Sequence, residues 1–92
     1  MQLDILTPEG KVYSGEADAV QLPGIDGLFQ VLNNHAPLIA ALAKGIVKVE
    51  HNNSKQTFNI KSGIVEVFKN KISVDPETID DLKLFIKLSK LI

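Results

Sequence analysis

From its first residues to about Asp75, the chain consists of short runs rich in Val, Ile and Leu that Gly, Pro and Asn interrupt at close intervals. Runs of this kind, bounded by turn-forming residues, are typical of β-strands. The interruptions divide the region into about nine or ten strands, and strands this short and this closely spaced form a sandwich or barrel of antiparallel sheets. The pattern therefore predicts an all-β domain over residues 1–75.

Two features of this region predict how its strands are covered and connected. In segment 47–50, two valines alternate with Lys48 and Glu50, which indicates a strand with one face in water. Segment 38–43 is apolar throughout, which predicts burial on both faces. Asn52-Asn53 and Lys69-Asn70 separate alternating runs and predict two hairpins, because Asn tolerates the positive φ of tight turns.

After Asp75 the pattern becomes that of a helix. Asp75 is a suitable N-cap, Pro76 suits the first helical position, and acidic residues near the start and lysines near the end complement the helix dipole. We predict a single short C-terminal helix over residues 76–92, about 25 Å long. Its apolar face, which requires a partner surface, comprises Ile79, Leu82, Phe85, Ile86, Leu88 and Ile92.

Composition argues against several classes of function. The net charge of -1 provides no positive surface for nucleic acid or anionic lipid, and the absence of cysteine excludes disulfides and thiolate chemistry. The longest apolar run, segment 36–43, is far shorter than the roughly 20 residues of a membrane-spanning helix, and Asp4 argues against a signal peptide. We therefore expect a soluble, monomeric domain with no nucleic-acid partner and no direct membrane insertion.

Few residues are candidates for catalysis or metal binding. His35 lies in a distinctive loop and could act as a general base or a metal ligand, but no nucleophile or second ligand is evident, so a packing, surface or partner contact is favoured. His51 is expected to face solvent. Glu77, Asp80 and Asp81 lack the alternating spacing of a calcium loop and are explained as helix-start residues. We expect no catalytic residue, no metal and no cofactor.

Segment 22–27, Leu22-Pro23-Gly24-Ile25-Asp26-Gly27, contains two glycines but no Lys-Ser or Lys-Thr pair after them. It is therefore interpreted as a tight turn between strands and not as a phosphate-binding loop. Leu28 and Phe29 follow the turn directly. Two large apolar side chains beside a polar turn serve either core packing or an interaction surface, and the residues alone favour neither.

Several motifs in this region occur together and in a fixed order. They are Leu22-Pro23-Gly24-x-Asp26-Gly27, Val31-Leu32-x-Asn34-His35-Ala36-Pro37-Leu38 and Leu42-x-x-Gly45, flanked by Leu3-Asp4-Ile5-Leu6-Thr7-Pro8-Glu9-Gly10, Val12-Tyr13-Ser14-Gly15 and Ser62-Gly63-Ile64-Val65-Glu66-Val67. Together they resemble the signature of the epsilon subunit of F-type ATP synthases, which is called delta in mitochondria. The resemblance covers about residues 1–75.

The resemblance implies a ten-stranded antiparallel β-sandwich of two sheets. It further implies a non-catalytic rotor subunit that links gamma to the c ring and couples ion flow to ATP synthesis in a proton-translocating synthase. Such a subunit lies on the cytoplasmic face of the inner (cell) membrane as a peripheral component. The positions that match the family's gamma-binding face are Thr7, His35 and Ala40, with Ala36, Pro37 and Leu38 close by. The positions that match its c-ring loop are Gly24, Ile25, Asp26, Gly27, Leu28 and Phe29.

The sequence also departs from this family. Gln30 stands where many members have Gly, and Ser62 replaces the first Gly of a Gly-Gly pair. After Asp75, members commonly continue into a helical hairpin that can inhibit ATP hydrolysis and in some binds ATP. Because residues 76–92 predict one helix and not a hairpin, neither property is carried over to them. The alternative function is a free-standing β-sandwich module that binds a peptide or small ligand, and a third possibility is a minimal hydrolase.

Overall fold

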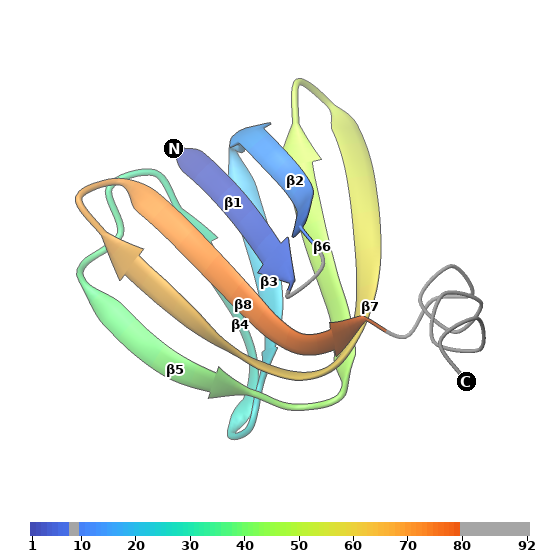
Figure 1. Ribbon diagram of the computed structural model, residues 1–92. Coiled ribbons are helices and arrows are strands. Elements are labelled where there is room, and N and C mark those ends of the chain that lie inside the picture. Colours follow the sequence, from blue (N-terminus) through green and yellow to red (C-terminus); the bar gives the residue numbers. More distant parts are fainter. Residues whose placement is uncertain (8–9, 80–92) are drawn as a thin grey trace.

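The computed structural model describes residues 1–7 and 10–79, and the side chains of 77–79 are outside that description (Figure 1). The described residues form eight β-strands and contain no helix, and therefore none that could cross a membrane. The strands are β1 Gln2–Thr7, β2 Gly10–Glu16, β3 Ala19–Gly24, β4 Gly27–Leu32, β5 Leu38–Leu42, β6 Gly45–His51, β7 Ser54–Phe68 and β8 Lys71–Ile79.

The strands form one hydrogen-bonded sheet that folds over into two layers (Figure 1). The first layer has the order β2-β1-β8-β7-β5, and the second consists of β4, β3, β6 and the first half of β7. The long strand β7 belongs to both, because its first half pairs with β6 and its second half with β5 and β8. The two layers are also joined where Gly24 of β3 pairs with Leu42 of β5.

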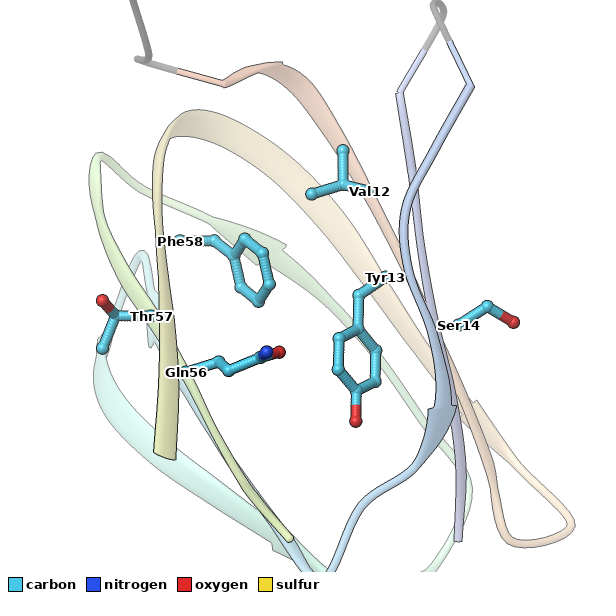
Figure 2. Close-up of a pocket in the computed structure, with 6 residues that line it drawn as sticks. All are labelled: Val12, Tyr13, Ser14, Gln56, Thr57 and Phe58. Carbon is cyan, nitrogen blue, oxygen red and sulfur yellow. The ribbon is translucent and has the colours of Figure 1, made fainter. Parts of the chain in front are cut away.

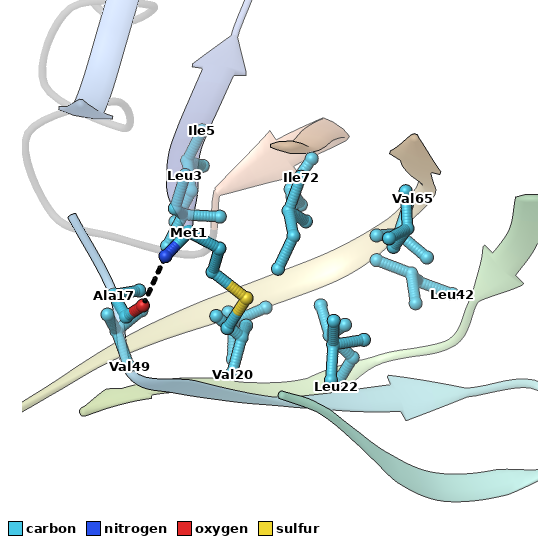
Figure 3. Close-up of a cluster of buried hydrophobic side chains, with 14 of the residues drawn as sticks. Met1, Leu3, Ile5, Ala17, Val20, Leu22, Leu42, Val49, Val65 and Ile72 are labelled. Carbon is cyan, nitrogen blue, oxygen red and sulfur yellow. Dashed lines mark hydrogen bonds between the residues drawn. The ribbon is translucent and has the colours of Figure 1, made fainter. Parts of the chain in front are cut away.

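The hydrophobic core lies between the inner faces of the two layers (Figure 3). Burial of each large side chain contributes about 1.5–3 kcal/mol, so the buried side chains of this core are the main stabilising feature of the fold. No buried polar or charged residue occurs in the described part of the chain. The largest fully buried side chains are Leu3, Ile5, Val65, Ile72 and Val74 from the first layer and Val20, Leu22, Val31, Val47, Val49 and Ile60 from the second.

Two tight hairpin turns are where the asparagines predict them. Asn52 and Asn53, between β6 and β7, have φ values of 50° and 64°, and Lys69 and Asn70, between β7 and β8, have 49° and 60°. Two central residues with positive φ match the right-handed twist of antiparallel strands. The prediction of both hairpins is confirmed.

The predicted number and direction of strands need correction. The described residues form eight strands and not ten, in part because β7 continues through the Ser62-Gly63 position without a break. The sheet is also not purely antiparallel, since β1 pairs with β8 in parallel, with Leu3 opposite Ile72 and Ile5 opposite Val74. Apolar-polar alternation predicts which side chains face the core, but it carries no information about strand direction.

The predicted helix start at Pro76 is wrong, because β8 continues as a strand to Ile79. The register between β7 and β8 shifts at Ser62 and Gly63, and such an irregularity tolerates a proline. Gly63 allows the close approach, since a Cβ there would lie 2.8 Å from the Cα of Pro76. The β region therefore extends past Asp75, and the helix predicted for 80–92 lies outside the described residues.

Candidate protein-interaction surfaces

Large apolar side chains lie on the outer faces of both layers. We define the hairpin surface as Ile25, Leu28 and Ile46, near the tip of the β3–β4 hairpin. We define the outer-sheet surface as Ile39, Ala41, Ile64 and Phe68, on β5 and β7. All of them except Ala41 are large hydrophobic residues with exposed side chains. In the described part of the chain, the residues of this kind are Val12, Ile25, Leu28, Leu32, Ile39, Ile46, Ile64 and Phe68.

The β3–β4 hairpin turns through Ile25 and Asp26, with Gly24 paired to Gly27. Gly27 has a φ of 127°, which disfavours other residues. The hairpin separates the two side chains that the sequence left undecided. Leu28 is 68% exposed, whereas Phe29 packs against the core.

Gly24 forms part of the surface against which Phe29 packs. A Cβ on Gly24 would lie 3.0 Å from two carbons of the Phe29 ring and 2.8 Å from the carbonyl oxygen of Gly27. The Phe29 ring therefore rests on a position that only glycine leaves open. Of the predicted c-ring residues, Ile25, Asp26, Gly27 and Leu28 are exposed, and Gly24 and Phe29 mainly support them.

Sequence reasoning missed Ile46. It is 49% exposed and alternates with the buried Val47, so it lies on the outer face of the second layer. Leu28 lies on the same face, where it pairs with Pro23, while its neighbour Phe29 packs inward. The signal was present, because an apolar residue at a water-facing position breaks the alternation seen in residues 47–50.

The outer-sheet surface corrects the prediction that segment 38–43 is buried on both faces. Leu38 and Ala40 pack partly against the core, opposite Val67 and Val65 of β7. Ile39 lies between them on the opposite face and is 74% exposed. Its apolar neighbours on this face are Ala41 and Ile64, which pair across β5 and β7. Within residues 1–7 and 10–76, only the inner face of this segment is covered by other side chains.

The loop between β4 and β5 carries His35. Asn34 adopts a positive φ of 64°, and its backbone N–H donates to the side-chain oxygen of Asn70 over 2.8 Å. The backbone N–H of His35 donates to the carbonyl of Leu32 at 3.2 Å, and its Nδ1 lies 2.7 Å from the carbonyl oxygen of Ala36. These contacts fix the loop beside the β7–β8 turn. His35 is partly buried, whereas Ala36 and Pro37 are exposed.

Thr7 lies far from this loop. Its hydroxyl donates to the carbonyl of Gly10 over 3.1 Å, at the end of β1. The other end of β1 is beside the β7–β8 turn, because Gln2 pairs with Lys71. The five residue-to-residue steps from Gln2 to Thr7 span about 17 Å at about 3.4 Å per step. The structure therefore brings His35, Ala36 and Pro37 together but does not place Thr7 beside them.

An open groove between β2 and β7 bears on the alternative function, a module that binds a small ligand (Figure 2). The ring of Tyr13 meets that of Phe58 edge to face, with centroids 6.1 Å apart, and the Tyr13 hydroxyl donates to the carbonyl of Glu16. No ionised side chain is among its lining residues, so the groove offers no anchor for a charged ligand. The groove is open to solvent, has a volume of about 480 Å³ and is lined by Val12, Tyr13, Ser14, Gln56, Thr57 and Phe58.

His51 lies in a polar cluster with Asp18 and Asn52. Its Nδ1 is 3.6 Å from a carboxylate oxygen of Asp18. The backbone N–H of Asn52 donates to the same carboxylate over 3.0 Å and holds the pKa of Asp18 below its ordinary value. Ser54 lies opposite His51 across the β6–β7 hairpin, but within the described residues His51 makes no hydrogen bond to a hydroxyl group. No group of three or more metal-binding side chains occurs within residues 1–7 and 10–79.

The comparison with known protein families decides among these interpretations. Residues 1–79, which include all eight strands, match the family model for the β-sandwich domain of the ATP synthase delta/epsilon chain. The chain belongs to this ATP synthase family. The match confirms the resemblance seen in the sequence motifs and the β-sandwich architecture of the fold.

Curated relatives agree with this assignment. The chain is 46% identical over 71 residues to the ATP synthase epsilon chain of Chlorobium limicola, a match that covers 76% of this chain and 81% of that one. It is 50% identical over 70 residues to the epsilon chain of Chlorobaculum tepidum, covering 75% and 80%. The epsilon chain of Helicobacter pylori strain HPAG1 is 37% identical over 87 residues, covering 95% and 68%.

Solved structures share the fold at lower sequence identity. A chain of the central stalk and c-ring structure of the Tetrahymena thermophila mitochondrial ATP synthase superposes with a TM-score of 0.76 at 17% identity, covering 90% of this chain and 67% of that one. A chain of the Euglena gracilis mitochondrial ATP synthase gives 0.79 at 21% identity, covering 97% and 59%. Family membership makes the described domain part of an ATP synthase stalk subunit, and so of a membrane-associated complex.

Proposed function

We propose that this chain is a non-catalytic rotor subunit of a proton-translocating ATP synthase that links gamma to the c ring and couples ion flow to ATP synthesis. It needs no cofactor for this role. In this proposal the subunit is peripheral and lies on the cytoplasmic face of the inner (cell) membrane. The outer-sheet surface and the β4–β5 loop bind gamma, and the hairpin surface contacts the c-ring loops.

The observation that carries the proposal is the exposure of Ile39. It lies in a segment that is apolar throughout, yet 74% of its surface is exposed. Glu66 lies opposite it on β7, and Ile64, which pairs with Ala41 on the same face, is 54% exposed. Apolar residues grouped on one outer face indicate a surface that another protein covers. The positions that match the family's gamma-binding face lie on the same strand or in the loop before it, apart from Thr7.

The side chains proposed to contact gamma therefore differ from those that the sequence leads one to expect. Leu38 and Ala40 pack partly against the core and are proposed to support the surface from within. Ile39 and Ile64 are proposed to make the apolar contacts, with His35, Ala36 and Pro37 at one end. Thr7 is proposed as a contact at the far end of the sheet.

The c-ring contact is proposed for the hairpin because its tip combines polar and apolar groups. Asp26 and the backbone of the turn provide hydrogen-bonding groups, and Ile25 and Leu28 provide exposed apolar surface. A mixed surface of this kind suits the polar loops at the end of a c ring better than a lipid surface, for which the hairpin carries no positive charge.

A binding experiment with three variants tests the proposal. The full chain should co-purify with its cognate gamma subunit, and Ile39→Asp should abolish that association while the domain stays folded. Leu28→Asp should leave gamma binding intact but reduce proton pumping in membranes that contain the assembled synthase. Val12→Asp is the matched control, because Val12 is an exposed apolar residue outside both surfaces. Retention of gamma binding by Ile39→Asp would contradict the proposed surface.

A further inference from the structure

The β3–β4 hairpin is attached to the end of β5 by backbone contacts that the function described so far does not explain. The N–H of Ile25 donates to the carbonyl of Ala41 over 3.2 Å, and the N–H of Ala43 donates to the carbonyl of Pro23 over 2.8 Å. Between these bonds, Gly24 pairs with Leu42. The hairpin tip is thus attached directly to the strand that carries Ile39.

Gly45, which closes the Leu42-x-x-Gly45 motif, lies directly against the base of the hairpin. A Cβ on Gly45 would stand 2.6 Å from Cβ and 3.1 Å from Cγ of Pro23. Real Cβ atoms do not approach another carbon this closely, and the proline ring cannot rotate away. Gly45 has no positive φ, so this contact, and not the backbone conformation, is what requires glycine.

We infer that Gly45 is a positioning residue that lets the hairpin bond to β5, so that the hairpin surface and the outer-sheet surface move as one rigid unit. The inference rests on the proposed function, in which these surfaces meet different partners. A load applied to Ile25 and Leu28 passes through the backbone of residues 41–43 to Ile39. A hairpin that pivoted on its own strands would absorb the load instead.

Amide hydrogen exchange tests the attachment directly in the full chain. In Gly45→Ala, the added methyl group pushes Pro23 away, and the amides of Ile25 and Ala43 should exchange at least about tenfold faster. Amides within the β1–β8 ladder should keep their wild-type rates. Gly15→Ala is the matched control, because a Cβ on Gly15 meets only ordinary contacts, the nearest being 3.8 Å from the Tyr13 hydroxyl. Unchanged exchange at both amides in a folded Gly45→Ala variant would overturn the inference.

A second variant tests the attachment without adding a side chain at Gly45. Ile25→Pro removes the N–H that donates to Ala41, and proline is well tolerated at the first central position of a tight turn. Ile25→Ala is its control, because it shortens the side chain and keeps the N–H. The Ala43 amide should exchange faster in Ile25→Pro than in Ile25→Ala. Equal exchange rates in the two variants would count against the attachment.

Coupling measurements on the assembled synthase separate this inference from the proposed function. Gly45→Ala should bind gamma as the wild type does and should lower ATP-driven proton pumping at an unchanged rate of ATP hydrolysis. If Leu28→Asp lowers pumping and Gly45→Ala does not, the inference fails and the proposed c-ring contact stands. If Leu28→Asp has no effect, the proposed contact fails, whatever the exchange rates show.

Discussion

The two faces of the first layer contain the same residue types in opposite surroundings. On the inner face, Ile72 of β8 has no exposed surface, and on the outer face, Ile64 of β7 is 54% exposed. Ile72 is needed to fill the core, whereas no other described residue buries Ile64. An apolar residue therefore indicates a fold requirement on one face and an interaction on the other, and only the structure distinguishes the two faces.

The largest expected effect comes from making the same substitution on both faces. Ile72→Ala should lower the free energy of unfolding by about 2–5 kcal/mol, because it leaves a cavity in the core. Ile64→Ala should change it by no more than about 0.5 kcal/mol, since its side chain is already in water. Urea denaturation of both variants measures the difference. Equal losses would show that the chain itself covers the outer face.

The outer face should reveal its role in binding to gamma. Ile64→Asp places a charge in the proposed interface and should weaken gamma binding by about thirtyfold or more, the effect of losing about 2 kcal/mol at a central contact. Titration calorimetry with the cognate gamma subunit measures it. Val12→Asp, outside the interface, should bind as the wild type does, and an equal loss in both variants would point to general electrostatics.

The hairpin allows the same comparison between neighbouring residues. Phe29→Ala should destabilise the domain by roughly 2 kcal/mol, less than the 3–5 kcal/mol of a fully buried phenylalanine, because its ring is only partly covered. Leu28→Ala should have an effect of at most about 0.5 kcal/mol. Thermal unfolding of the two variants compares them. The assignment of Leu28 to the surface would be wrong if its variant were the less stable.

The smallest effect is expected from the polar part of the outer face. The hydroxyl of Ser14 donates to Asp4 over 2.7 Å and holds the pKa of Asp4 below its ordinary value. A carboxylate whose pKa is lowered in the folded state stabilises that state at pH values above its ordinary pKa. This contribution is lost as the pH falls through the lowered pKa. The wild type should therefore lose slightly more stability below about pH 4 than Asp4→Asn does. Identical pH profiles in acid would contradict this.

Most of the local structure could be predicted from the sequence. Asn52, Asn53 and Asn70 define two hairpins because their backbones accept positive φ without help from the rest of the molecule. Alternation identified Val47, Val49, Ile72 and Val74 as core residues. The ordered motifs identified the family. The turn and alternation signals act over a few residues, and the family signal needs only the order of short motifs along the chain.

Candidate residues for the interaction surfaces could be predicted only in part. The motifs indicated Ile25 and Leu28, which are exposed, but grouped them with Phe29, which packs against the core. They indicated Leu38 and Ala40 and omitted Ile39, because a run that is apolar throughout does not reveal which face a partner will cover. Pro76 suited a helix start equally well, and its place in β8 depends on the space that Gly63 leaves 13 residues earlier in the chain.

The sequence by itself determined the strand-and-turn pattern, most of the core and the family of this chain. Tertiary structure decided that β1 runs parallel to β8, that β7 spans both layers, and that Ile39 and Ile64 face outward together. The physical reason is the separation along the sequence of the residues on which each feature depends. Turn geometry and alternation depend on neighbouring residues, whereas burial depends on which distant strand lies opposite, and that choice is made only when the two layers pack.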